Sequence, residues 1–194
     1  FQPAERLSFD AATFYNDYDR LFSIDQGASS VRTAPVTHIY VPLMVGNQGE
    51  GNTYGAELAT QWSVNDWWRL SGAYAYLRVR LNEAGDGFSP GDDPRHQASL
   101  RSSMDLPGNL ELDVWGRYVD KLPHLGFGPN FNSFPAYYDL DVRLGWRPTK
   151  NLEFSIVGQN LISPRRYEFI HDTRLSFAGS AVQRGFYVQM TARF

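Results

Sequence analysis

Hydrophobic and polar residues alternate along most of this chain with a period of two. The clearest stretch covers residues 109–119, where apolar residues hold the even positions and charged residues several of the odd ones. Over residues 137–146, Leu140 and Val142 share one side, and Asp141 falls between them. Successive side chains of a strand point to opposite faces, so this period predicts strands with one apolar and one polar face.

The same alternation divides the whole chain into about eight segments of roughly ten residues, the length at which a tilted strand crosses a bilayer. The segments lie near residues 5–21, 53–64, 67–80, 96–106, 109–119, 137–146, 151–161 and 183–194. No apolar run approaches the roughly 18 residues of a membrane helix, but a strand needs only every second residue to face lipid.

The connections between these segments fall into two length classes. Tight turns are predicted at 65–66, 106–109 and 148–150, and long segments rich in Gly, Pro, Asn and Asp at about 22–52, 81–95, 120–135 and 163–182. The first long segment is expected to include an extension of the next strand through His38–Val45. Short turns on one rim and long loops on the other are typical of outer-membrane barrels. An antiparallel sandwich also explains the alternation, but it does not explain this segregation.

Aromatic and charged residues favour the barrel over the sandwich. Trp62, Trp67, Trp68 and Trp146 lie beside the short turns, as expected for rings at a membrane interface. An Arg or Lys that faces lipid at mid-depth costs about 2–4 kcal/mol, and the central charges all fall on the polar face. Those predicted to face the lumen are Glu57, Arg101, Glu111, Asp113, Arg117, Asp139, Asp141 and Arg143. The fold class predicted is therefore all-β, a transmembrane antiparallel meander β-barrel.

The composition limits the kinds of functional site that the chain can form. The net charge of −3 does not suggest a nucleic-acid partner, and the absence of cysteine excludes disulfides and thiolate metal sites. The four histidines lack metal-ligand spacing, and Asp86, Asp92 and Asp93 lack the EF-hand pattern. Ser163, Asn160 and His171 do not by themselves make a triad, which is defined by geometry. We expect no enzymatic activity, no cofactor and no metal site.

Two sets of residues are candidates for ligand binding. The lumen-facing charges either form cross-strand ion pairs or guide an anionic ligand. Residues of the long segments could contact a ligand more directly, because aromatic rings can stack on a planar chelate, although they could equally pack loop against loop. These loop candidates are His124, Phe127, Phe131, Phe134 and His171.

The C-terminal segment 185–194 resembles the signal that the barrel-assembly machinery reads, a final aromatic preceded by alternating apolar residues. The residues that match are Phe186, Val188, Met190, Ala192 and Phe194. Three further stretches resemble the C-terminal third of TonB-dependent receptors. These are 13–21 (TFYNDYDRL), 52–58 (NTYGAEL) followed by 67–74 (WWRLSGAY), and 152–161 (LEFSIVGQNL) with Arg166-Tyr167.

This resemblance implies that residues 1–194 are the C-terminal portion of a barrel of about 22 strands, without the N-terminal TonB box and plug domain. The chain starts at Phe1 with no initiator Met or signal peptide, so we expect a processed chain or a fragment. The implied function is TonB-energised uptake of a scarce nutrient, such as a ferric siderophore or cobalamin, across the bacterial outer membrane. The implied partners are outer-membrane lipid and lipopolysaccharide, the TonB complex, the barrel-assembly machinery and a metal-chelate ligand. The alternative is a small self-closed barrel with a structural or adhesive role.

Overall fold

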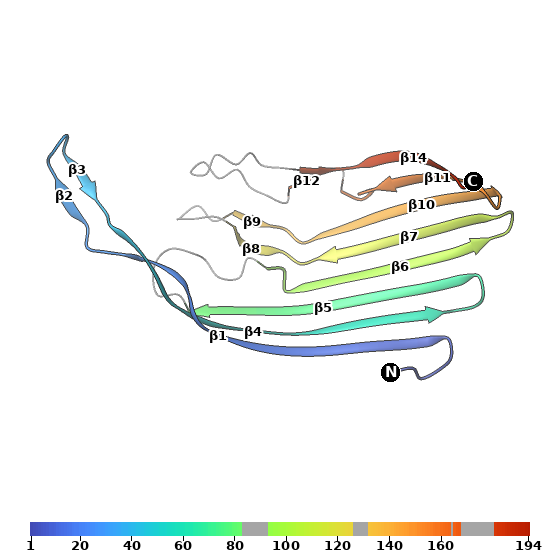
Figure 1. Cartoon of the computed structure of the whole chain (residues 1–194), viewed down its shortest axis with the longest axis horizontal. Helices are drawn as coiled ribbons and strands as arrows, with labels where there is room; N and C mark the ends of the chain where they lie inside the picture. The colour runs from blue at the N-terminus through green and yellow to red at the C-terminus, as the bar shows by residue number, and fades with distance from the viewer. Residues whose placement is uncertain (83–92, 126–131, 164, 168–180) are drawn as a thin grey trace.

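One antiparallel sheet of eight strands makes up most of the molecule (Figure 1). The computed structural model describes all residues except 83–92, 126–131, 164 and 168–180. The described residues contain no helix, and hence none that could span a membrane. The strands of the large sheet are β1 (Leu7–Gln26), β4 (Leu43–Ser63), β5 (Trp68–Asn82), β6 (His96–Leu106), β7 (Leu110–Val119), β10 (Tyr137–Thr149), β11 (Leu152–Gln159) and β14 (Gly185–Ala192).

The sheet is a meander, because its spatial order β1-β4-β5-β6-β7-β10-β11-β14 follows the order of the chain. The remaining strands form three small hairpins within the long connections. They are β2 (Ser30–Arg32) with β3 (His38–Tyr40), β8 (Leu122–Leu125) with β9 (Asn132–Phe134), and β12 (Arg165–Tyr167) with β13 (Ala181–Gln183). The prediction of about eight consecutive antiparallel strands is confirmed.

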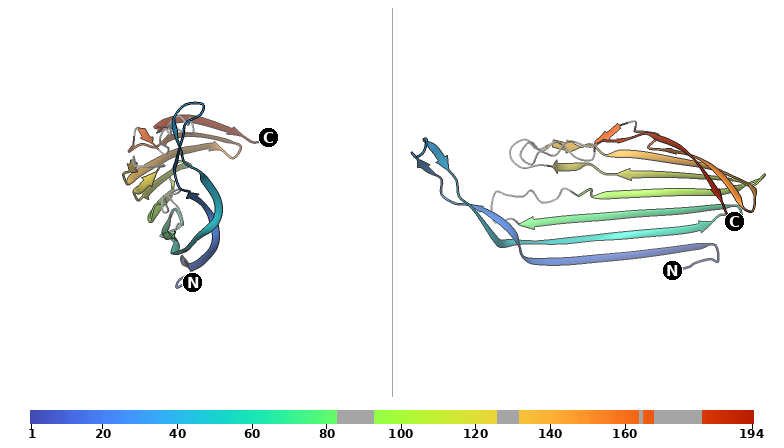
Figure 2. Two further views of the ribbon diagram at one scale, coloured as in Figure 1. Left: turned by 90° about the vertical axis from the view of Figure 1, so that its left-hand side faces the viewer. Right: turned by 45° about the horizontal axis from the view of Figure 1, so that its top comes forward.

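The sheet is curved into a wall, as its end-on view shows (Figure 2). Hollows of about 370 Å³ and 700 Å³ lie on its polar side, which is therefore the concave side. In the described part of the chain, β1 and β14 are the two edges, and each is hydrogen-bonded to one neighbour only. The wall is open, so the eight strands do not close on themselves.

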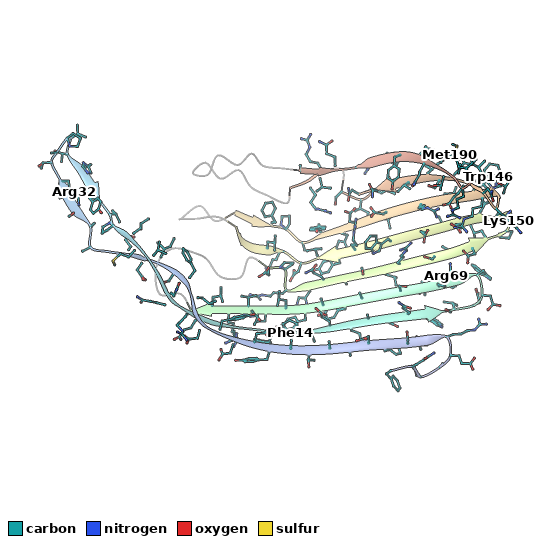
Figure 3. The ribbon with its side chains drawn as sticks, viewed as in Figure 1. Phe14, Arg32, Arg69, Trp146, Lys150 and Met190 are labelled. Carbon is teal, nitrogen blue, oxygen red and sulfur yellow. The ribbon has the colours of Figure 1, made fainter. Side chains whose placement is uncertain are left out.

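The tight connections and the long connections lie at opposite ends of the strands (Figure 1). We call these the short-turn end and the long-loop end. Trp146, Lys150 and Met190 lie together at the short-turn end, far from Arg32 on the projecting arm of β2 and β3 (Figure 3). The turn at 107–109 uses Gly108 and Asn109 with φ of 79° and 58°, a left-handed backbone that suits these two residue types.

The β1–β4 hairpin extends further than predicted, because β1 ends at Gln26 instead of near residue 21 and β4 begins at Leu43 instead of near residue 53. Register shifts between Tyr18 and Ser23 interrupt the period of two, so the alternation fades while pairing continues. The expected extension through His38–Val45 is also divided. β3 ends at Tyr40 and pairs with β2, and β4 begins at Leu43, after Pro42, which has no N–H for a ladder.

Two smaller points concern the turn after β10 and a glycine of β4. β10 continues to Thr149 after an irregularity beyond Trp146, so the predicted turn at 148–150 is displaced to Lys150 and Asn151. Gly55 pairs with Phe14, and a Cβ at this position would clash with the carbonyl oxygen of Tyr76 and lie 2.6 Å from Phe14 Cζ. The glycine of segment 52–58 is therefore required because its neighbours leave no space for a side chain.

Candidate functional site

Strand pairing places the apolar positions of all eight strands on one face. Leu100, Gly116 and Leu140 are successive partners across β6, β7 and β10, and Ile156 pairs with Val188 across β11 and β14. We call this convex side the apolar face and the concave side the polar face. The predicted separation of the two residue classes therefore continues from strand to strand.

A row of tyrosines crosses the apolar face toward the long-loop end. Tyr118 and Tyr138 have ring centroids 4.9 Å apart, and the Tyr74 hydroxyl lies 2.7 Å from His96 Nδ1. The members of this tyrosine row are Tyr15, Tyr54, Tyr74, Tyr76, His96, Tyr118 and Tyr138. His96 thus belongs to an aromatic row, and the described residues contain no group of three or more His, Asp or Glu that could hold a metal ion.

A second aromatic row, the tryptophan row, crosses the same face at the short-turn end. It contains Trp62, Trp67, Trp68, Trp146 and Phe154, and the rings of Trp67 and Trp68 stack with centroids 6.1 Å apart. The two rows are eight positions apart on three strands, at residues 54 and 62, 68 and 76, and 138 and 146. Eight positions span about 27 Å along a strand. At a strand tilt of about 40° this is about 20 Å along the membrane normal, somewhat less than the apolar band of about 25 Å in membrane barrels.

An ion-pair network covers the polar face near the short-turn end. Arg143 Nη1 lies 3.1 Å from Glu111 and 3.3 Å from Asp113, and Arg143 also binds Glu153. Arg147 binds the same two glutamates, at 2.8 Å from Glu111 and 3.2 Å from Glu153. The network therefore links β7, β10 and β11 across their hydrogen-bond ladders.

The same network continues onto β6 and β5. Asp113 accepts hydrogen bonds from Arg101 at 3.0 Å and from the Ser103 hydroxyl at 2.6 Å. Arg69 and Asp105 form a further pair at 2.8 Å. Carboxylates shared between arginines on neighbouring strands fix the positions of the strands relative to one another.

A second cluster surrounds Asp139 near the long-loop end. The Asp139 side chain is completely buried, and its Oδ2 lies 2.6 Å from Arg166 Nη1 and 3.4 Å from Arg117 Nη2. Arg117 also binds Asp141 at 2.9 Å, and the Arg166 guanidinium lies 4.0 Å from the centre of the Tyr137 ring. Since Arg166 belongs to β12, this cluster attaches a long-loop hairpin to the wall.

A hollow of about 700 Å³ lies beside this cluster, at the long-loop end of the polar face. Its lining combines aromatic and apolar side chains with two guanidinium groups and one carboxylate, and includes Phe134, Tyr137, Leu122, Asp120, Arg165 and Arg166. Mostly apolar walls with a few convergent polar groups are typical of small-molecule sites. Chemically, the hollow suits a ligand with flat surfaces and negative charge.

The structure places the predicted loop candidates as follows. Phe134 lines the hollow of about 700 Å³. His124 belongs to β8, but its side chain is outside the described residues, as are Phe127, Phe131 and His171 altogether. Their proposed roles therefore stay predictions.

The other predicted residues lie on the faces that the alternation assigns to them. Seven of the eight predicted lumen charges belong to the two ion-pair clusters, whereas Glu57 lines a separate hollow of about 370 Å³. Of the residues predicted to form an assembly signal, Phe186, Val188, Met190 and Ala192 pair with β11 on the apolar face, and Phe194 follows the strand fully exposed.

Sequence reasoning missed Arg147, Glu153 and Arg166 as members of these clusters. Glu153 lies one position from Phe154, so its place on the polar face follows from the alternation. Arg166 gives no such signal, because it lies in a long connection. The tyrosine row was also detectable, through the repeated eight-position spacing from tryptophan.

Comparison with known proteins agrees with this geometry. The family model described as "TonB dependent receptor-like, beta-barrel" matches residues 1–161. The ferric-catecholate import receptor Fiu of E. coli K12, in its closed form, superposes with a TM-score of 0.72 at 18% identity, over 99% of this chain and 26% of its own. The siderophore receptor PiuA of Acinetobacter baumannii superposes with a TM-score of 0.69 at 19% identity. The match covers 95% of this chain and 26% of the PiuA chain.

The pyoverdine receptor FpvA of Pseudomonas aeruginosa PAO1, bound to pyoverdine, gives a TM-score of 0.70 at 17% identity, over 97% of this chain and 27% of its own. The chain therefore spans about a quarter of the length of these receptors. Identities this low support the likeness of fold alone, whereas the family model covers most of the chain. The chain belongs to the TonB-dependent receptor-like β-barrel family of the Gram-negative outer membrane.

Proposed function

We propose that the intact protein is an outer-membrane receptor that binds an anionic metal chelate at its long-loop end and imports it with energy from TonB. The observation that carries the proposal is the hollow lined by Phe134, Tyr137, Arg165 and Arg166, on the concave face of a barrel of this family. The family is one of transporters, which fits the expectation of no enzymatic activity.

The polar face is the wall of the lumen in this proposal. Its charges mostly hold the wall together, because each of Arg101, Arg117 and Arg143 has at least one carboxylate partner. Glu57 differs, since it has no ion pair among the described residues and lines an open hollow of about 370 Å³. We assign Glu57 to contact with water or with a plug domain, and the other lumen charges to the rigidity of the wall.

The ligand class follows from the lining of the larger hollow. Guanidinium groups bind carboxylate, phosphate and other oxyanions, and aromatic rings stack on planar groups. Fiu imports a ferric catecholate and FpvA is bound to pyoverdine, which supports a siderophore or similar chelate here. His124, Phe127, Phe131 and His171 are the proposed additional ligand contacts, because they lie in connections at the same end of the strands.

The proposed partners occupy different surfaces. Outer-membrane lipid contacts the apolar face, and TonB acts through a part of the receptor outside this chain. The barrel-assembly machinery reads the alternate apolar positions of β14, with Phe194 beyond its end.

The test is ligand uptake by cells that carry the full gene, with and without TonB. We expect uptake of radioactive iron supplied as a siderophore complex to require TonB. Arg165→Gln should weaken ligand binding, whereas Lys121→Gln, an exposed control at the same end that does not line the hollow, should leave it unchanged. Uptake that persists without TonB would reject the energised receptor in favour of a passive pore.

The small self-closed barrel has no comparable support. Such a barrel requires β1 to pair with β14, whereas these strands are the opposite edges of the described sheet. If the full gene product took up no chelate in the same assay, the structural or adhesive barrel would be favoured instead.

A further inference from the structure

We propose that Arg78 and Arg80 bind a phosphate group of a glycolipid in the outer leaflet of the membrane. Both arginines belong to the apolar face, because they follow Tyr76 at alternate positions of β5. On β4, Arg78 pairs with Tyr54 and Arg80 with Asn52. The face that presents apolar and aromatic side chains up to the tyrosine row thus carries two guanidinium groups beyond it. The proposal rests on the membrane location of the family, and the identity of the transported ligand does not enter it.

The height of the two arginines along β5 matches a lipid headgroup. The tyrosine row marks the interface between hydrocarbon and water. Arg78 and Arg80 lie two and four positions beyond Tyr76, toward the long-loop end, which is about 7 and 14 Å along the strand. Arginine side chains extend their charged ends toward polar surroundings, so both guanidinium groups lie at the level of the headgroups.

The charge environment distinguishes this pair from the arginines of the polar face. Within the described part of the chain, neither Arg78 nor Arg80 has a carboxylate at ion-pair distance, although Asp17, Glu50 and Asp120 lie on the same face above the tyrosine row. The Arg80 guanidinium instead lies 5.4 Å from the centre of the Tyr54 ring. With respect to the described residues, the donors of both groups are therefore available to an anion.

The chemistry of the pair selects a phosphate. A guanidinium presents parallel N–H donors that match two oxygens of one phosphate, and two such groups two positions apart on one face reach the same anion or neighbouring ones. The position at the lipid boundary, rather than in the lumen or on a loop tip, selects a membrane lipid over a soluble ligand. In the outer leaflet of the outer membrane, the lipid with this chemistry is the phosphorylated glycolipid lipopolysaccharide.

The experiment titrates the full-length receptor, purified in detergent, with short-chain lipopolysaccharide and counts bound glycolipid by native mass spectrometry. Arg78→Gln and Arg80→Gln should each weaken binding about fivefold, the effect of one basic residue at a lipid surface, and the double variant about 25-fold if the two act independently. Arg6→Gln removes the same charge at the short-turn end and should leave binding unchanged.

Two further arms separate the sources of phosphate. Dephosphorylated glycolipid should bind the wild type no more tightly than the phosphorylated glycolipid binds the double variant. Inorganic phosphate should not compete with the glycolipid at equal concentration. Unchanged binding by a double variant that shows the wild-type heat-dependent gel shift would overturn the proposal, as would equal binding of the dephosphorylated lipid. Effective competition by inorganic phosphate would replace the lipid site with a free-anion site. If the double glutamine variant does not fold, the double lysine variant replaces it, with a smaller expected loss.

Discussion

Val188 on the apolar face is 72% exposed, whereas Asp139 on the polar face is 1% exposed. In a water-soluble protein the two values would be reversed, because large aliphatic side chains are buried and carboxylates face water. Here the exposed residues of the convex face include Leu58, Leu100 and Ile156, and the crowded residues of the concave face include paired charges. The two faces therefore fit two solvents, hydrocarbon on the convex side and water on the concave side.

The two faces are also stabilised differently. The apolar face has aromatic contacts at its two rows and isolated aliphatic side chains between them. On the polar face, ion pairs join neighbouring strands, so one side chain stabilises the positions of two or three strands at once. Substitutions that exchange the character of the two faces therefore test the comparison most directly.

The largest effect is expected for an arginine placed in the middle of the apolar band. Val142→Arg should lower the free energy of unfolding by about 2–4 kcal/mol, because the guanidinium would face hydrocarbon midway between Tyr138 and Trp146. The matched control is Ala73→Arg, at similar height on the polar face beside a hollow of about 370 Å³. Urea unfolding of the full-length protein in lipid vesicles measures both. Equal destabilisation would mean that the two faces do not meet different solvents.

A smaller effect is expected for the buried carboxylate of the polar face. Asp139→Asn should destabilise the protein by about 2 kcal/mol, since hydrogen bonds to charged groups contribute about 1.5–3 kcal/mol and Arg117 and Arg166 lose their shared anion. Asp10→Asn is the control, because Asp10 shares the polar face and has no ion pair among the described residues. Thermal unfolding should show no change for the control. A similar loss in both variants would point to a general effect of removing carboxylates.

Arg143→Met should lower the free energy of unfolding by about 1 kcal/mol, less than the change at Asp139. The Arg143 side chain is 26% exposed, so water partly solvates it and its three carboxylate partners. The loss should shrink in high salt, since dissolved ions screen partly exposed pairs. Unfolding titrations at low and high salt give the comparison. An effect independent of salt would assign the role of Arg143 to packing rather than to charge.

The smallest effect is expected at the rim. Arg6→Gln breaks a 2.6 Å ion pair with Asp66, but both side chains are exposed, so the change in unfolding free energy should be at most about 0.5 kcal/mol. A double-mutant cycle with Asp66→Asn isolates the pair. A coupling free energy of more than about 1 kcal/mol would show that Arg6 and Asp66 are less accessible to water than their exposed side chains indicate.

Most of the fold follows from the sequence, because a lipid-facing strand leaves few choices at alternate positions. Residues 109–119 and 137–146 show this strict alternation, and the structure confirms both as strands with the expected partners. The full length of β4 did not follow, since beyond Tyr54 the hairpin leaves the apolar band and the alternation is no longer enforced. The register shifts near Leu21 depend on pairing, which the pattern does not contain.

The candidate site was less accessible to sequence reasoning. Alternation assigns Arg117 and Asp139 to one face, but it does not show that β12 brings Arg166 to the same carboxylate. That contact depends on how a long connection folds back over the wall, and no periodicity in residues 163–182 encodes it. Of the five predicted loop residues, Phe134 alone has a described side chain, because β9 holds it next to the hollow.

The eight-position spacing between the tyrosine and tryptophan rows has a consequence for where this wall is stable. At a strand tilt of about 40° the rows are about 20 Å apart along the membrane normal, whereas the hydrocarbon of an average bilayer is about 30 Å thick. An average bilayer would have to thin around the wall, at a fraction of a kcal/mol for each ångström of mismatch. The thinner outer membrane needs little such deformation. Hydrophobic mismatch would therefore oppose insertion into a thicker membrane met on the way to the cell surface.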